Sequence, residues 1–108
     1  MSVEIEVKGE TVIARLIGEL DHHSAATIRE QIDNSAELNM PSLLVLDFEK
    51  ISFMDSSGIG LVLGRYRNLS KRGAKVKVTG VSPQIFKVMQ LSGIERLMTL
   101  ERLNQEED

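Results

Sequence analysis

Residues 43–66 read LLVLDFEKISFMDSSGIGLVLGRY, and this stretch decides the fold class. Its opening run, LLVLDF at 43–48, is almost continuously apolar, which is typical of a strand buried on both faces of a partly parallel sheet. The segment from Ser57 to Arg72 instead repeats its apolar residues at helical spacing and predicts a helix. A buried strand followed closely by a helix indicates an α/β fold. The expected apolar stripe of this helix consists of Ile59, Val62, Leu63, Tyr66 and Leu69.

The rest of the chain continues this alternation. VEIEV at 3–7 and TVIARLIGEL at 11–20 flank the turn residues KGE and predict a hairpin, and AKVKVTGV at 74–81 predicts another strand. LMTLERL at 97–103 predicts a short edge strand or a last partial helix. Because parallel strands are joined by right-handed crossovers, this order predicts one α/β domain over residues 1–108, with a mixed, mostly parallel sheet packed with helices.

The helices have recognisable boundary signals. Ser24 is expected to cap a helix near 24–38, which a Met-Pro pair then ends. A Ser-Pro pair opens the predicted helix near 83–92, and a glycine follows it. The middle helix is expected near 57–72, with Gly73 in a left-handed conformation at its end.

Composition limits the classes of function. The 42% apolar content is enough for a core, and a net charge of -3 does not favour nucleic acid or an anionic membrane as a partner. The absence of cysteine excludes disulfides, zinc-thiolate sites and cysteine nucleophiles. The first residues lack a signal-peptide pattern, and no apolar run approaches the ~20 residues that span a bilayer. We therefore expect a cytoplasmic protein with no nucleic-acid or membrane partner.

Asp55, Ser56 and Ser57 stand between the buried strand and the middle helix. Open α/β sheets bind ligands at this edge, and the free N–H groups of a helix N-terminus favour a phosphate. Helix capping alone would also account for these residues, because Asp and Ser caps each contribute about 1 kcal/mol. Ser56 or Ser57 is the expected N-cap. Spacing alone leaves both interpretations open.

Three glycines interrupt the middle helix at a cost in stability. Gly58, Gly60 and Gly64 each cost roughly 0.8–1 kcal/mol relative to alanine. Gly60 and Gly64 lie on one side of the helix, where a missing Cβ lets another backbone approach closely. Gly58 and Gly60 fall in the first turn, where a partner protein or an enzyme acting on a serine requires bare backbone. The glycines therefore favour a functional role for this turn.

Nucleotide-binding and hydrolytic sites fit the sequence poorly. GIGLVLG has three residues between its second and third glycines, one more than a dinucleotide fingerprint, and no P-loop motif is present. A triad of Ser56 with His22 or His23 would lack the G-x-S-x-G elbow of a hydrolase nucleophile. A metal site at Asp21, His22 and His23 is disfavoured, because two adjacent histidines rarely face the same ion. We expect no metal and no cofactor.

Three segments together resemble a known family. GELDHHSA at 18–25, FMDSSGIGLVLGRY at 53–66 and SPQIFKVMQLSGI at 82–94 are similar to the signature segments of the anti-sigma factor antagonists of the STAS superfamily. The resemblance covers nearly the whole chain. Within the family, ELDHH and LGRY are more similar to the sporulation branch than to the general-stress branch.

The resemblance implies a regulated binding protein. In this family the serine after the motif aspartate, here Ser56, is phosphorylated by the cognate anti-sigma factor, an ATP-dependent serine kinase, and a phosphatase of the PP2C class reverses this. The unphosphorylated form binds the anti-sigma factor and frees the sigma factor, whereas the phosphorylated form does not. The chain would be a substrate and a ligand, not an enzyme. Chemistry alone also allows Ser57, and the alternatives are a general-stress antagonist or a STAS scaffold that is never phosphorylated.

The partner-binding surface implied by the family lies on two turns. Both should follow strands that end at the same edge of the sheet, so their residues should form one exposed patch. A phosphate would add about -1.5 to -2 charges near Glu19 and repel an acidic or ATP-bearing partner. The longer C-terminal helix usual in the family would be short or missing, and the acidic tail ERLNQEED should fray. The expected patch, with Gly60 beside it, consists of Asp21, His22, His23, Asp55, Ser56, Ser57 and Gly58.

Overall fold

The computed structural model describes residues 1–103, which form a five-stranded sheet in the order β1-β2-β3-β4-β5. β1 is antiparallel to β2, and each later strand is parallel to the one before it. The predicted mixed, mostly parallel α/β architecture is therefore confirmed. The elements are β1 (Ser2–Lys8), β2 (Thr11–Leu20), α1 (His22–Asn39), β3 (Leu43–Met54), α2 (Ser56–Ser70), β4 (Lys75–Val81), α3 (Pro83–Leu91), the 3-10 helix η1 (Ile94–Arg96) and β5 (Thr99–Arg102).

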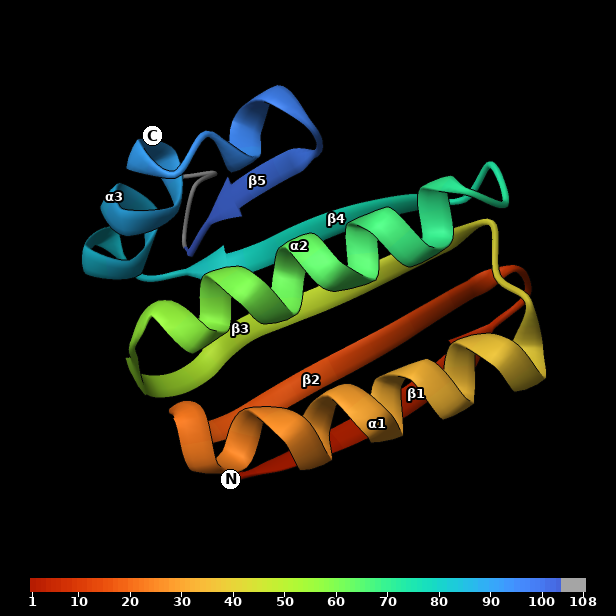
Figure 1. Cartoon of the computed structure of the whole chain (residues 1–108), viewed down its shortest axis with the longest axis horizontal. Coiled ribbons are helices and arrows are strands. Elements are labelled where there is room, and N and C mark those ends of the chain that lie inside the picture. Colours follow the sequence, from red (N-terminus) through yellow and green to blue (C-terminus); the bar gives the residue numbers. More distant parts are fainter. Residues whose placement is uncertain (104–108) are drawn as a thin grey trace.

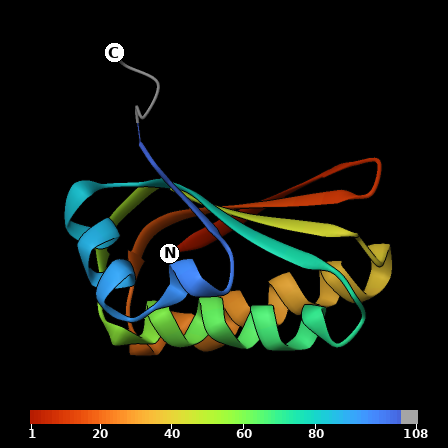
Figure 2. The same cartoon turned by 90° about the horizontal axis from the view of Figure 1, so that it is seen from above.

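The helices cover one face of the sheet. α1 and α2 run side by side across it, and α3 lies at the end of the molecule where β4 ends (Figure 1). Figure 2 shows that the opposite face carries no helix in residues 1–103. Side chains alternate between the two faces of a strand, so every second residue points into the core. The fully buried strand residues include Val12, Ala14, Leu16, Leu44, Leu46 and Val78.

α1 begins with an aspartate cap instead of the predicted serine cap. The Asp21 carboxylate accepts a hydrogen bond from the backbone N–H of Ser24 at 3.0 Å, and the Ser24 hydroxyl accepts one from the N–H of Asp21 at 3.1 Å. This reciprocal pair is a capping box, with Asp21 as the N-cap and His22 as the first helical residue. The prediction of Ser24 as the N-cap is wrong, although the serine still supports the helix start.

The other predicted boundaries agree with the structure. The Ser82 hydroxyl accepts a hydrogen bond from the N–H of Ile85 at 3.4 Å, and Pro83 is the first residue of α3. Gly73 and Gly93 have φ values of 78° and 85°, a left-handed conformation that glycine adopts without strain. The local sequence signals were therefore sufficient to predict these helix ends.

β3 is longer than its apolar run. It continues beyond Phe48 to Met54, because the following residues still pair with β2. Arg15 is opposite Asp47 and Leu20 is opposite Met54, so β3 has two residues more than β2 over this span, placed at two register shifts. Such bulges increase the twist and bend a strand. Figure 2 shows the two strands curving toward the helices at this end.

The C-terminal part of the described chain forms η1 and then β5, which pairs with β4. The edge-strand alternative for residues 97–103 is therefore confirmed. Residues 104–108 lie outside the described residues, and so do the predictions of a fraying acidic end and a shortened C-terminal helix. None of the helices in residues 1–103 is long and apolar enough to cross a membrane.

Arg65 of α2 is a charged residue inside the core, 4% exposed. It lies in the buried row of Leu61 and Leu69, one turn away on either side. Its Nε lies 2.8 Å from Asp33 Oδ1 of α1, a contact of opposite charges that is not aligned as a hydrogen bond, and its Nη1 donates to the carbonyl of Leu61 at 3.3 Å. Burial lowers the pKa of the Arg65 guanidinium, and Asp33 opposes this effect. This pair joins the two helices.

The predicted apolar stripe of α2 is correct in part. Val62 and Leu69 are buried as expected, whereas Ile59, Leu63 and Tyr66 are only half-buried at the rim of the core. The centre of the buried face is displaced toward Leu61 and Arg65, because α2 also packs against α1 and not only against the sheet.

Candidate functional site

The turns that follow β2 and β3 lie side by side at one edge of the sheet. The strands are parallel, and Leu20 is opposite Met54, so Asp21 and Asp55 each follow the last residue of a paired strand. The backbone N–H of Asp55 donates to the carbonyl of Leu20 at 3.2 Å. Figure 1 shows the N-termini of α1 and α2 next to each other at this end. The prediction that both turns share an edge is confirmed.

Asp55 caps α2, as Asp21 caps α1. Its carboxylate accepts a hydrogen bond from the N–H of Ser57 at 2.8 Å, and its carbonyl accepts one from the N–H of Gly58 at 3.0 Å. α2 therefore begins at Ser56, and the prediction of Ser56 or Ser57 as the N-cap is wrong. An ionised carboxylate is as good a cap as a hydroxyl and also interacts with the helix dipole. The serine hydroxyls are thereby free of the capping role.

The two serines differ in exposure. Ser56 is exposed, whereas Ser57 is half-buried. Within residues 1–103 the Ser56 hydroxyl forms no hydrogen bond, and it stands at the first position of α2, at the positive end of the helix dipole. An exposed hydroxyl in this position can accept a phosphoryl group, because the helix N-terminus offsets part of the added charge.

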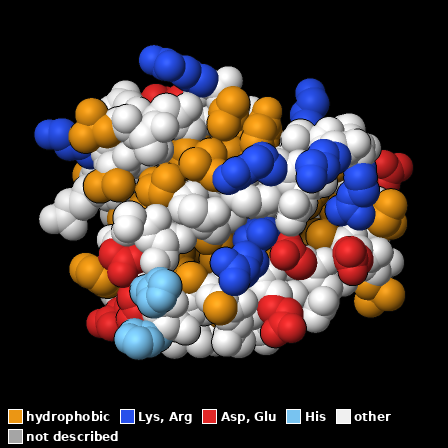
Figure 3. Space-filling view, viewed as in Figure 1, with side chains coloured by type: hydrophobic (Ala, Val, Ile, Leu, Met, Phe, Trp, Pro, Cys, Tyr) orange, Lys and Arg blue, Asp and Glu red, His pale blue; other side chains and the backbone are white. Residues whose placement is uncertain are grey.

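His22 and His23 are exposed at the start of α1, beside the half-buried Asp21. Their rings lie edge to face, with centroids 6.1 Å apart. The N–H of Ser24 lowers the pKa of the Asp21 carboxyl, so this group is ionised at neutral pH. Figure 3 shows the two histidines next to acidic side chains at this end of the molecule. Among residues 1–103, no group of three or more His, Asp and Glu side chains is arranged to hold a metal ion.

Gly58 is buried, so the prediction that it is exposed is wrong. A Cβ at this position would overlap Cγ and Sδ of Met54 and would lie 3.2 Å from Cδ2 of Leu20. The missing side chain thus serves packing beneath the turn. Gly60 is exposed, and apart from its chain neighbours and the backbone of α2 itself no described atom lies within 4 Å of a Cβ built on Gly60 or Gly64. The predicted close backbone approach at this pair is wrong.

Alanine at these glycines should have opposite effects on stability. Gly60→Ala and Gly64→Ala should each raise the free energy of unfolding by about 0.8–1 kcal/mol, because their Cβ atoms enter open space. Gly58→Ala should lower it by about 1 kcal/mol, since overpacking against Met54 exceeds the gain in helix propensity. Urea unfolding measures each value.

The double variant Gly58→Ala/Met54→Ala provides the control for this series. It should lose less stability than the two single losses added together, because the smaller side chain makes room for the new Cβ. A Gly58→Ala variant as stable as Gly60→Ala would contradict the packing role of Gly58.

A groove of about 750 Å³ opens beside Asp21, between α1 and the start of β1. Its lining combines the acidic side chains of Glu19 and Asp21 with the apolar Val3 and Ile28. Sequence reasoning missed it, because it depends on the β1–β2 register, which brings Ser2 opposite Ile17. The two-residue turn at 9–10 is the signal from which that register could have been found.

Comparison with known proteins agrees with this geometry. The STAS domain family matches residues 2–107. An anti-sigma F factor antagonist of Lysinibacillus sphaericus is 43% identical over 88 residues, which are 82% of this chain and 75% of that protein. A solved structure of the anti-sigma factor antagonist SpoIIAA in its unphosphorylated form is 40% identical, with a TM-score of 0.80 over 97% of this chain and 91% of that one. The Bacillus cell fate determinant SpoIIAA in its phosphorylated form is also 40% identical, with a TM-score of 0.74 over 97% and 95% of the two chains.

Proposed function

The chain belongs to the STAS domain family, in the group of the anti-sigma factor antagonists, and we propose that it binds an anti-sigma factor and so frees a sigma factor. Antagonists of this group are regulatory proteins and not enzymes. The similar proteins described above belong to the sporulation branch that ELDHH and LGRY predicted, which confirms that prediction. We place this activity in the cytoplasm.

Ser56 is the proposed phosphate acceptor. The observation that carries this proposal is an exposed hydroxyl, free of hydrogen bonds within residues 1–103, at the first position of a helix already capped by Asp55. Its neighbour Ser57 is half-buried and donates its N–H to that cap. The anti-sigma factor would act as the ATP-dependent serine kinase, and a PP2C-type phosphatase would remove the phosphate.

Charge is the proposed means by which phosphorylation prevents binding. A phosphoserine adds about -1.5 to -2 charges at neutral pH. Asp55 is adjacent in the chain, Asp21 follows the neighbouring strand, and neither first helical turn contains Lys or Arg to neutralise the phosphate. The modified surface would therefore repel an acidic or ATP-bearing partner.

The fold does not need to change for this switch to work. Asp55 already caps α2, and the backbone of this turn is hydrogen-bonded to β2 through Leu20. The helix N-terminus stabilises a phosphate on Ser56 locally, so phosphorylation alters the surface charge without unfolding the turn. His22, His23, Ser57 and Gly60 complete the proposed contact surface, while Gly58 supports it from beneath.

Mapping of the phosphorylated residue tests this proposal. The protein is incubated with ATP and each candidate anti-sigma factor kinase, and the phosphopeptides are identified by mass spectrometry. We expect phosphate on Ser56 in the wild type and in Ser57→Ala, and none in Ser56→Ala, because Ser56 is exposed whereas Ser57 is half-buried.

Two results would contradict the assignment. Phosphate on Ser57 with Ser56 unmodified would show that Ser57, and not Ser56, is the acceptor. Phosphate on neither serine, with binding to the anti-sigma factor intact, would instead indicate a STAS scaffold that is not regulated in this way.

A further inference from the structure

The outer edge of β1 has no partner strand in residues 1–103. β1 is seven residues long and pairs with β2 on its inner side. A two-residue turn joins the two strands, so Lys8 and Thr11 form the pair that closes the hairpin. The alternation of an antiparallel ladder then directs the N–H and C=O groups of Val3, Ile5 and Val7 away from β2. These groups are available to another strand.

The edge is also apolar on the side that faces the helices. Ile5 and Val7 are 37% and 48% exposed, although the residues opposite them in β2, Ala14 and Val12, are fully buried. On this face the side chains therefore change from fully buried in β2 to exposed in the adjacent β1. A further strand beside β1 would cover these side chains, and removing apolar surface from water is favourable.

α1 presents an uncharged flank above the same edge. Thr27 and Gln31 line the groove that α1 forms with Val3 of β1, so this flank faces β1. Leu38 lies two turns beyond Gln31 on the same side and is 83% exposed. The other flank carries Asp33, which pairs with Arg65 of α2.

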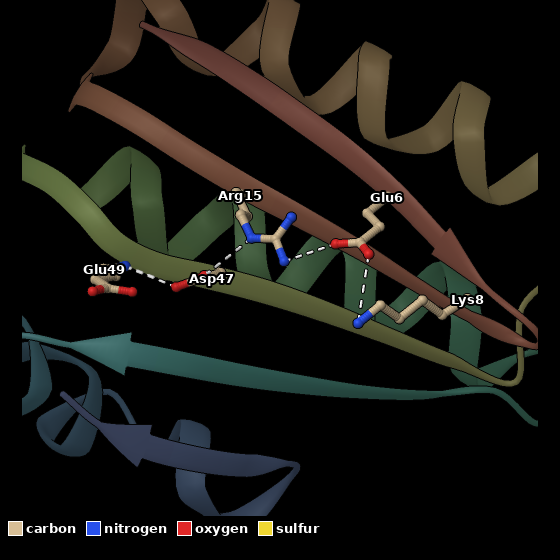
Figure 4. A network of polar contacts seen from close by, with 5 residues as sticks. All are labelled: Glu6, Lys8, Arg15, Asp47 and Glu49. Atoms are coloured by element: carbon tan, nitrogen blue, oxygen red, sulfur yellow. Dashed lines mark hydrogen bonds and ion pairs between the residues drawn. The ribbon is translucent and has the colours of Figure 1, made fainter. Parts of the chain in front are cut away.

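The open face of β1 carries charges in a self-complementary order. Glu4 and Lys8 lie at equal distances along the strand on either side of Glu6. Glu6 is held by Arg15 at 2.8 Å and by Lys8 at 3.5 Å, and Arg15 also lies 3.8 Å from Asp47 (Figure 4). Charge at Glu6 is thus largely balanced within one chain, whereas Glu4, although opposite Arg15 in the β1–β2 ladder, has no ion-pair contact within residues 1–103.

We propose that a second copy of this chain pairs with the outer edge of β1, antiparallel, about a two-fold axis at Glu6. In that register Ile5 lies opposite Val7 of the second copy, and both residues direct their N–H and C=O groups toward the pair. Glu4 lies opposite Lys8 of the second copy, and symmetry repeats this contact. The two sheets become continuous, and the uncharged flanks of the two α1 helices approach each other.

The dimer leaves the proposed contact surface of each chain available. Asp21 lies near Ser2, at the start of β1, so the axis at Glu6 places the two surfaces on opposite sides of it. A dimer would therefore be a bivalent antagonist. This inference does not depend on the proposed function, because it uses neither Ser56 nor the partner protein.

A mixing experiment tests the register. Sedimentation equilibrium from micromolar to millimolar concentrations should give the wild type a mass approaching twice the 12.0 kDa of one chain. Glu4→Lys alone and Lys8→Glu alone should each weaken self-association about tenfold, because each places like charges opposite one another twice. An equimolar mixture of the two variants should recover wild-type association, since both contacts then join opposite charges.

A single-cysteine experiment tests the axis independently, because the chain has no cysteine of its own. Directly opposite residues of a non-hydrogen-bonded pair are about 4.5 Å apart at Cα, within the range that a disulfide spans. Under mild oxidation Glu6→Cys should form a covalent dimer, whereas the matched Glu4→Cys should not. Three results would each overturn the proposal. They are a wild type that stays monomeric, a mixture that associates no more strongly than either variant alone, and equal cross-linking by both cysteines.

Discussion

Ser56→Asp should bind the anti-sigma factor at least about tenfold more weakly than the wild type, and phosphorylation of Ser56 should weaken binding by about a hundredfold or more. The reason is accumulation of like charge at one edge of the sheet. Asp55 precedes the serine, and Asp21 is ionised because the N–H of Ser24 lowers the pKa of its carboxyl. One carboxylate imitates only part of the phosphate charge, so it should have the smaller effect. Isothermal titration calorimetry with the anti-sigma factor measures both.

Matched variants separate charge from capping and folding. Ser56→Ala should keep wild-type affinity and should remain bound in the presence of ATP, because no phosphate can be added. Asp21→Asn retains a good N-cap and removes the charge, so its melting temperature should be unchanged. A change in its affinity for the anti-sigma factor would then show that the partner contacts the Asp21 charge. Equal loss of affinity in Ser56→Ala and Ser56→Asp would mean that the hydroxyl itself is the contact, and the charge mechanism would be wrong.

Asp33→Ala should lower the free energy of unfolding by about 3 kcal/mol, the largest stability effect expected from one surface-accessible side chain. The loss arises at its partner, because the guanidinium of Arg65 is 4% exposed and would remain charged in the core with only the Leu61 carbonyl as acceptor. Asp33 itself is 34% exposed, so we take the lower end of the range for broken buried pairs. In a domain of this size each kcal/mol corresponds to about 4–8 °C in melting temperature.

The double variant distinguishes a buried charge from a general loss of packing. Arg65→Met keeps much of the side-chain volume and removes the charge, so Asp33→Ala/Arg65→Met should recover most of the stability lost in Asp33→Ala. Urea unfolding of the four proteins gives the coupling energy. Purely additive losses would show that the ion pair does not join α1 to α2 as described.

Strand direction was the most predictable feature of the site. The strands before Asp21 and Asp55 could be recognised from their apolar pattern, and parallel strands must end at the same edge. That the two turns lie next to each other could therefore be predicted without any knowledge of side-chain contacts. The N-caps were less predictable, because Asp and Ser are almost equally good caps and stand next to each other at Asp55 and Ser56. In the structure Asp55 has the extended backbone of an N-cap, with φ -101° and ψ -169°, so Asp55 and not Ser56 is the cap.

The roles of Gly58 and Arg65 could not be derived from local pattern. Gly58 is required because Met54 packs beneath it, and that contact depends on extra residues in β3 that no strand propensity predicts. Arg65 is found in the core because Asp33 of another helix meets it. Its place in a row with Leu61 and Leu69 was the available signal, but a charged residue in such a row usually marks the edge of a helix face.

The two register shifts of β3 determine how far apart the two capped turns stand. They lie between Arg15 and Leu20 on the β2 side, whereas the pairing before them is regular. Deleting one bulge residue would withdraw Ser56 relative to Asp21 by about 3.3 Å, the rise of one strand residue, without disturbing the register of the earlier pairs. Bulge length thus sets the spacing of the two turns, and it also sets how Ile51 and Met54 of β3 meet the core. A chain that differed at this spacing alone would keep every charged residue of the two turns and present them in a different arrangement.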